Sequence, residues 1–143
     1  MTYEEYLEKY GKLVYRNVGT SMLPLLKQGR DLFIIEPVKG KRCKKYDVVL
    51  YRCPPGKYVL HRIVEVREKD YVILGDNCLK KEYGIKDEDI LGVMTGFVRK
   101  EKQRNCKEPV YQVYSRMWVW TYPVRWVINQ LRIFTRRFLG KKA

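Results

Sequence analysis

The fold is decided by residues 58–77, whose sequence is YVLHRIVEVREKDYVILGDN. Two runs of β-branched and aromatic residues, Tyr58–Arg67 and Tyr71–Leu74, flank the charged residues 68–70, which predicts an antiparallel hairpin. With the turn inside residues 68–70, the register places His61 opposite Asp76 or Asn77. Directly or diagonally opposed side chains in such a pair lie within contact range. The sequence therefore predicts that an imidazole and a carboxylate meet in this hairpin.

The same pattern of short strand-forming runs continues on both sides of the hairpin. Further short runs of strand-forming residues are separated by glycine, proline and charged clusters, which is typical of a mainly β domain built from short strands. We place this domain at residues 13–104. The additional predicted strands are Leu13–Val18, Leu32–Glu36, Val48–Arg52 and Ile90–Val98.

The first residues, 1–12, predict a short amphipathic helix. Thr2 and Glu5 have the spacing of a capping box, and Gly11 supplies a stop. Between them, tyrosine and leucine recur at helical spacing, at Tyr3, Tyr6, Leu7 and Tyr10.

Charge is concentrated at the other end of the chain. The 143 residues carry a formal net charge of +14, and about half of that excess lies in residues 105–143. An apolar fraction of 45% and an aromatic fraction of 13% exclude a disordered polycation or a histone-like tail. We treat residues 105–143 as a basic, aromatic C-terminal extension, joined to the β-domain by a polar linker at residues 100–109.

Within this extension, Pro123 can open a basic amphipathic helix. Residues 118–139 combine arginines with aromatic side chains at the helix start, as membrane-surface segments do. A helix that packs on its own β-domain or on a second subunit is the alternative. Nucleic acid is a less favoured partner, because the aromatics alternate with leucine and isoleucine at helical spacing. One predicted face holds Val124, Val127, Ile128, Leu131, Phe134 and Phe138.

The sequence has no run of about 18 apolar residues and no apolar core of a secretory signal at its start. We therefore expect a cytoplasmic protein that residues 118–139 could hold at a membrane surface. The cysteines Cys43, Cys53, Cys78 and Cys106 form no C-x-x-C pair, and His61 is the single histidine. We expect reduced thiols, no metal site and no cofactor.

The residues around Ser21 suggest nucleophilic chemistry. Ser21 follows Gly19 and Thr20 at the exit of a predicted strand and precedes an apolar segment that contains Pro24. Unpaired backbone amides of Thr20 and Ser21 at such a turn could stabilise an oxyanion. Ser21, His61 and Gly75-Asp76-Asn77 each have an ordinary structural interpretation as well: a capping serine, a core histidine and a turn, respectively.

Taken together, three motifs are more specific. Gly19-Thr20-Ser21-Met22-x-Pro24, then Val59-Leu60-His61-Arg62-Ile63, then Gly75-Asp76-Asn77 resemble the ordered motifs of type I signal peptidases and their LexA-like relatives. The resemblance covers residues 14–98. It implies the complex β fold of that superfamily, with Ser21 as nucleophile, His61 as general base and Asp76 as its partner. Gly19, Met22, Pro24, Gly75 and Asn77 would support these residues.

The match departs from the family in three places. His61 stands where most bacterial members have a lysine, so the chain is closer to the histidine-using branch. Gly19 occupies a position where some members have a serine that assists the oxyanion. We also expect no N-terminal membrane anchor, which is more similar to the small members suspected of trimming leader peptides.

The expected function is that of a serine endopeptidase that cleaves a leader or signal peptide from a peptide or preprotein through an acyl-enzyme. One alternative is a catalytically inert β-domain whose C-terminal helix docks to a membrane surface or partner. A second alternative is self-cleavage in the linker, as in the LexA-like relatives. The sequence leaves the oligomeric state open.

Overall fold

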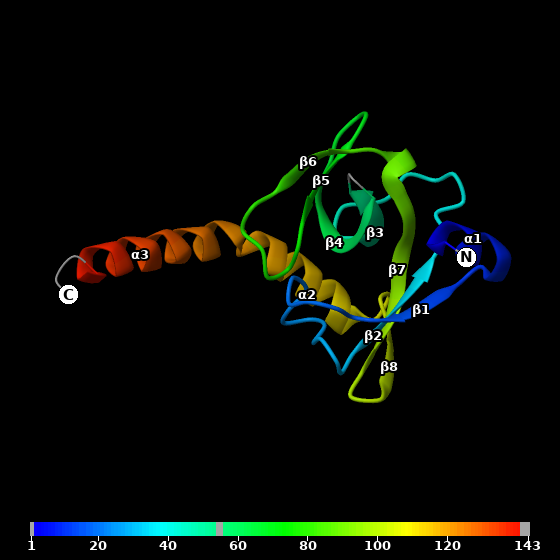
Figure 1. Cartoon of the computed structure of the whole chain (residues 1–143), viewed down its shortest axis with the longest axis horizontal. Helices are drawn as coiled ribbons and strands as arrows, with labels where there is room; N and C mark the ends of the chain where they lie inside the picture. Colours follow the sequence, from blue (N-terminus) through cyan, green and yellow to red (C-terminus); the bar gives the residue numbers. More distant parts are fainter. Residues whose placement is uncertain (1, 54–55, 141–143) are drawn as a thin grey trace.

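A single antiparallel sheet dominates the computed structural model, which describes residues 2–53 and 56–140 (Figure 1). Its strands are ordered β1-β2-β7-β3-β4-β5-β6, and β8 pairs with β7. This arrangement confirms the mainly β prediction. The strands are β1 (Leu13–Arg16), β2 (Leu32–Glu36), β3 (Val48–Cys53), β4 (Lys57–Val66), β5 (Tyr71–Leu74), β6 (Glu82–Ile85), β7 (Ile90–Arg99) and β8 (Lys102–Asn105).

Three α-helices and one short 3₁₀ helix accompany the sheet among the described residues. They are α1 (Tyr3–Tyr10), η1 (Asp87–Asp89), α2 (Pro109–Trp120) and α3 (Tyr122–Gly140). Helix α1 has the predicted capping box, with Thr2 and Glu5 bonded reciprocally and Gly11 in the left-handed region at its end. The helix expected to open at Pro123 is confirmed as α3, whereas α2 was not predicted.

Two strands, β6 and β8, were not predicted from the sequence. β8 occupies part of the expected linker at residues 100–109, so the linker prediction is wrong there. Lys100 and Glu101 take positive φ angles of 49° and 68°, which makes the tight turn that pairs Arg99 with Lys102. All four residues of β8 are exposed, so no alternating apolar pattern marked the strand.

The sheet buries side chains on both faces. Along β3, Val48 and Leu50 belong to one apolar cluster, and Val49 and Tyr51 belong to a second, as the period of two requires. The first cluster also receives three residues from the long β1–β2 connection, Met22, Leu25 and Leu26, which are 1%, 4% and 0% exposed. This burial anchors the connection that carries Ser21.

The base of the β1–β2 connection is closed by buried polar groups. The Asn17 N–H donates to the carbonyl of Asp31 at 3.0 Å, and the Asn17 side-chain amide donates to the Leu26 carbonyl at 3.2 Å. The Asp31 carboxylate accepts from the Lys27 N–H at 2.7 Å and from Arg30 Nε at 2.7 Å. The connection is therefore a fixed loop with its own hydrogen bonds.

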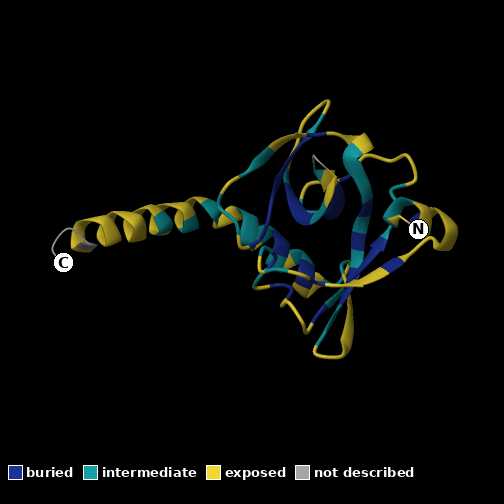
Figure 2. Ribbon diagram, in the orientation of Figure 1, coloured by how far each residue is buried: buried dark blue, intermediate teal, exposed yellow. Residues whose placement is uncertain are grey.

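The C-terminal helices differ in how they contact the sheet. Helix α2 packs against the β-domain and buries Tyr111 and Ser115. Helix α3 leads away from it, and its surface is mostly exposed (Figures 1 and 2). The extension expected from residue 105 onward thus divides into a packed helix and an exposed one. No helix among the described residues has the length and apolar character needed to cross a membrane.

The anchoring of the β1–β2 connection can be tested on two leucines. We expect Leu26→Ala to lower the free energy of unfolding by about 2–5 kcal/mol, because it leaves a cavity under the loop. Leu131→Ala, at a position 60% exposed on α3, should change it little. Urea unfolding followed by circular dichroism measures both, and equal effects would contradict the packing described.

Candidate active site

Ser21 and His61 line the same pocket, which has a volume of about 780 Å³. Gly75 lies between them. A Cβ atom at Gly75 would lie 2.8 Å from the Ser21 carbonyl oxygen and 2.9 Å from His61 Cδ2, closer than atoms can pack. The absence of a side chain at this position therefore allows the serine loop and the histidine strand to converge.

The Gly75-Asp76-Asn77 turn is bonded directly to the serine loop. The Asn77 N–H donates to the Ser21 carbonyl at 2.8 Å, and Asn77 Nδ2 donates to the Thr20 carbonyl at 3.1 Å. The Asp76 N–H points at Met22 Sδ, 3.5 Å away. The three motifs that the sequence singled out thus meet in space.

The supporting residues of the serine motif shape its loop. Gly19 has φ = +85°, a left-handed conformation that favours glycine, and Met22 is buried beneath the turn. Pro24 is exposed, and its carbonyl accepts a hydrogen bond from Arg99.

Next to the turn the hairpin has one of the two predicted registers, with Val66 opposite Tyr71, but farther along the strands the register is shifted by one residue. Ile63 pairs with Ile73, but Glu65 pairs with Val72, so Val64 is an extra residue on β4. This bulge places Arg62 opposite Leu74, and His61 then lies level with Gly75 and not with Asp76 or Asn77.

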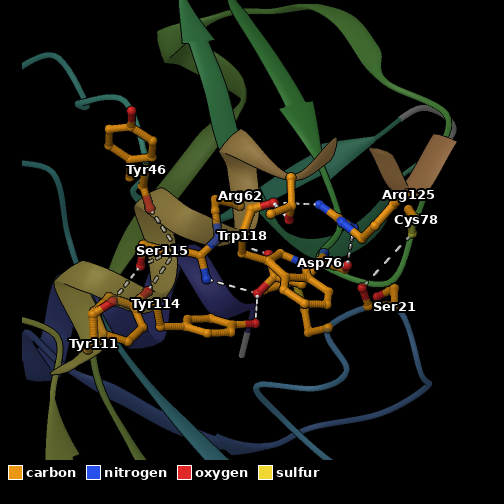
Figure 3. Close-up of polar contacts among 12 residues, drawn as sticks. Ser21, Tyr46, Arg62, Asp76, Cys78, Tyr111, Tyr114, Ser115, Trp118 and Arg125 are labelled. Carbon is orange, nitrogen blue, oxygen red and sulfur yellow. Dashed lines mark hydrogen bonds and ion pairs between the residues drawn. The ribbon is translucent and has the colours of Figure 1, made fainter. Parts of the chain in front are cut away.

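The consequence is that Asp76 pairs with Arg62 (Figure 3). Arg62 Nε and Nη2 donate to the two carboxylate oxygens of Asp76 at 2.8 and 2.9 Å, and both side chains are about 1% exposed. The Tyr114 hydroxyl donates a further bond to Asp76 at 2.7 Å. No hydrogen bond between Asp76 and His61 is found within residues 2–53 and 56–140, so the expected orienting contact is corrected to an Arg62 ion pair.

Helix α2 and the start of α3 complete this buried polar cluster. Arg62 Nη1 donates to Ser115 Oγ at 2.8 Å and to the Tyr111 hydroxyl at 3.2 Å. Trp118 Nε1 and Arg125 Nη1 both donate to the Asp76 carbonyl, at 2.7 and 3.1 Å (Figure 3). The C-terminal helices thus fix the turn that holds the serine loop.

His61 has a different partner, Tyr51 on the neighbouring strand. Val49 pairs with His61, and Tyr51 lies two residues farther along the same face of β3, a diagonal neighbour. The Tyr51 hydroxyl lies 3.2 Å from His61 Nδ1 and 2.6 Å from Glu82 Oε2. Glu82 Oε1 is 3.7 Å from the same ring nitrogen.

This chain of contacts fixes the tautomer of His61. A phenol has one proton, and the carboxylate of Glu82 accepts it, so the Tyr51 oxygen is left to accept from Nδ1–H. Burial and the bond to Glu82 raise the pKa of Tyr51, which keeps the phenol protonated. The Nε2 atom of His61 then carries the free lone pair that a general base needs.

Burial also sets the charge of His61, which is 8% exposed. Desolvation lowers its pKa below the ordinary value of about 6.5, against the opposing charges of Glu82 and Asp76. The imidazole is therefore neutral at neutral pH.

The groups around the Ser21 hydroxyl fit acyl transfer. In the described part of the chain, neither the Thr20 nor the Ser21 backbone amide donates a hydrogen bond, so both are free for an oxyanion. No bond joins the Ser21 hydroxyl to His61 among those residues, and such bonds often form only when substrate binds. Burial raises the pKa of the nearby Cys78 thiol, which disfavours the thiolate and leaves Ser21 as the candidate nucleophile.

Several residues of the site were not anticipated from the sequence. Tyr51 could have been found by pairing the strands on either side of Pro54-Pro55-Gly56. Glu82 lies on β6, a strand that the sequence analysis did not predict. Arg62 stood inside a quoted motif without a role, and Tyr114, Trp118 and Arg125 had no signal beyond an aromatic, basic composition.

Searches of models of known protein families, of curated proteins and of solved structures found no match to this chain.

The buried ion pair can be tested against an exposed one of the same geometry. We expect Asp76→Asn to lower the free energy of unfolding by about 3–5 kcal/mol, because Arg62 keeps a buried charge without its partner. Asp70→Asn, in the solvent-exposed pair with Arg67, should have little effect. Urea unfolding of both variants gives the comparison, and a small loss for Asp76→Asn would refute the role assigned to the pair.

Proposed function

We propose that this protein is a serine endopeptidase with the fold and mechanism of the signal peptidase and LexA-like superfamily. One observation carries the proposal: Ser21 and a neutral, buried His61 approach each other across Gly75 in one pocket. The order of the three motifs along the chain supports the same conclusion.

In the proposed reaction, His61 Nε2 takes the proton of Ser21 Oγ as the oxygen attacks the scissile carbonyl. The amides of Thr20 and Ser21 stabilise the oxyanion. The carbon–nitrogen bond then breaks, and the leaving amine receives the proton from His61. His61 next activates a water molecule, which hydrolyses the acyl-enzyme and restores Ser21.

Tyr51 and Glu82 act here in the orienting role that the sequence assigned to Asp76. When His61 becomes an imidazolium, its Nδ1–H points at Tyr51, and the Glu82 carboxylate lies 3.7 Å away. A negative charge at that distance stabilises the protonated ring. Asp76 contributes through its charge, and through the turn that its ion pair fixes.

The pocket walls favour an extended peptide as substrate. β1 pairs only with β2, and residues 57–61 of β4 pair only with β3 within the described chain, so each offers a free strand edge. Both edges line the pocket that contains Ser21. A peptide that adds a strand to such an edge gains main-chain hydrogen bonds. The proposed substrates are the leader or signal segments of a peptide or preprotein.

The first test is digestion of a mixed peptide library, analysed by mass spectrometry. We expect cleavage by the wild-type protein and a loss of about 10⁴-fold or more in Ser21→Ala and in His61→Ala. Cys78→Ala should still cut, because its thiol is not the nucleophile. Cuts that survive Ser21→Ala would contradict the assignment, and no cuts by any form would favour the inert docking module.

The pH dependence of kcat/KM tests His61 as the base. Because only the neutral ring accepts a proton, activity should fall on the acid side, with its midpoint below 6.5. Glu82→Gln removes a charge that raises this pKa, so its midpoint should move to lower pH. A midpoint at or above about 6.5 in the wild type, or a midpoint that rises in Glu82→Gln, would count against this base.

A further inference from the structure

The two C-terminal helices carry an exposed apolar stripe that neither the fold nor the proposed chemistry uses. Its residues are spaced alternately three and four apart, so they fall on one side of a helix. Their exposed fractions range from 50% for Val127 to 81% for Val110. The stripe consists of Val110, Val113, Met117, Trp120, Val124, Val127, Leu131, Phe134 and Phe138.

The stripe continues across the junction of α2 and α3. Thr121 is the one residue between the helices, and its backbone stays in the right-handed helical region. The Thr121 N–H donates to Met117 and the Arg125 N–H donates to Thr121, each at 3.0 Å, which keeps the helical bonding pattern. In Figure 1, α3 leaves the end of α2 at a bend and leads away from the sheet, and Figure 2 shows α3 mostly exposed.

The stripe widens on α3 itself. Ile128 and Leu139 lie on the same side and are 44% and 59% exposed. Arg125, Arg132 and Arg136 flank this face at helical spacing. An exposed apolar face of this size marks a surface that is covered when the protein acts.

The charge of the two C-terminal helices indicates what kind of partner covers the apolar stripe. Residues 109–140 contain five arginines and no aspartate or glutamate. A second copy of the same helices would bring arginine against arginine, with no opposite charge to pair across a helix–helix contact. A surface of negative charge with an apolar interior complements both features, and an anionic lipid bilayer has that combination.

We propose that α3, extended by the exposed side of α2, docks in the plane of an anionic membrane surface. The apolar face enters the boundary between headgroups and acyl chains, and Arg132 and Arg136 contact lipid phosphates. Trp120, which is 66% exposed and belongs to the stripe, adds an aromatic side chain that favours this depth. Over about 28 Å of helix axis, α3 is long enough to lie along the surface.

Docking would hold the body of the protein in a defined place. The Tyr122 hydroxyl donates to the Leu79 carbonyl at 2.7 Å, and Arg125 binds the Asp76 carbonyl. The start of α3 is thereby attached to residues 76–79. The pocket beside this turn would lie near the bilayer surface, whatever its chemistry.

Vesicle flotation of the full chain tests the proposal. The probes are vesicles of phosphatidylcholine alone and of equal parts phosphatidylcholine and phosphatidylglycerol. We expect binding to the anionic vesicles, weakened by salt, and much weaker binding to the neutral ones. Leu131→Ser with Phe134→Ser should reduce binding by at least about a hundredfold. Asn129→Ser with Gln130→Ser, on the polar side of the same helix, should bind like the wild type.

A second pair of substitutions isolates the charge. Arg132→Gln with Arg136→Gln should weaken binding to anionic vesicles by about thirtyfold and leave the weak neutral binding unchanged. The proposal would be overturned if the wild type did not float with anionic vesicles or bound neutral vesicles equally well. It would also be overturned if the serine substitutions at Asn129 and Gln130 weakened binding as much as those at Leu131 and Phe134. Sedimentation without vesicles supplies the remaining outcome: a stable dimer that Leu131→Ser with Phe134→Ser dissociates would assign the face to a second copy. Peptide cleavage is measured separately, so its failure would leave this result intact.

Discussion

The ion pair between Arg62 and Asp76 is the interaction on which the rest of the site depends. Both side chains are almost completely buried, where charges are costly unless they are paired and fully hydrogen-bonded. The structure meets that requirement with two bonds between the partners, a bond from Arg62 to Ser115 of α2, and a bond from Tyr114 of α2 to Asp76. β4, the turn after β5 and α2 are therefore held in one arrangement.

The Arg62–Asp76 ion pair also positions the reacting groups. With Asp76 fixed, Asn77 can bond the carbonyls of Thr20 and Ser21 and hold the serine loop against the turn. Neighbouring residues of a strand point to opposite faces, so Arg62 faces the α2 side while His61 faces Tyr51. β4 therefore presents the charged Arg62 on one face and the neutral base His61 on the other.

Much of this arrangement could be predicted from local patterns. The runs of β-branched residues gave six strands, because each has a buried face, and the Thr2–Glu5 spacing gave α1. β8 could not be found, because all its side chains face solvent and its pairing arises from a tight turn at Lys100 and Glu101. Helix α2 was not predicted, although Pro109 at its first position and the helical spacing of Val110, Val113 and Met117 indicate one.

The partner of His61 shows most clearly what could not be predicted from the sequence. The sequence predicts the meeting of the hairpin residues, but one bulged residue, Val64, shifts the register. Because side chains alternate between faces, a shift of one exchanges the neighbours of every residue. Asp76 consequently pairs with Arg62, and the orienting role falls to Tyr51 and Glu82, which lie on other strands. Bulges depend on the packing of the whole sheet, which hydrophobic pattern alone does not specify.

The most direct test of this account is the nuclear magnetic resonance spectrum of the imidazole ring. His61 is the single histidine of the chain, so its nitrogen signals need no assignment. The account predicts a proton on Nδ1, a bare Nε2, and a titration midpoint below the ordinary value of about 6.5. A proton on Nε2 at neutral pH, or a midpoint at or above that value, would contradict His61 as the oriented base.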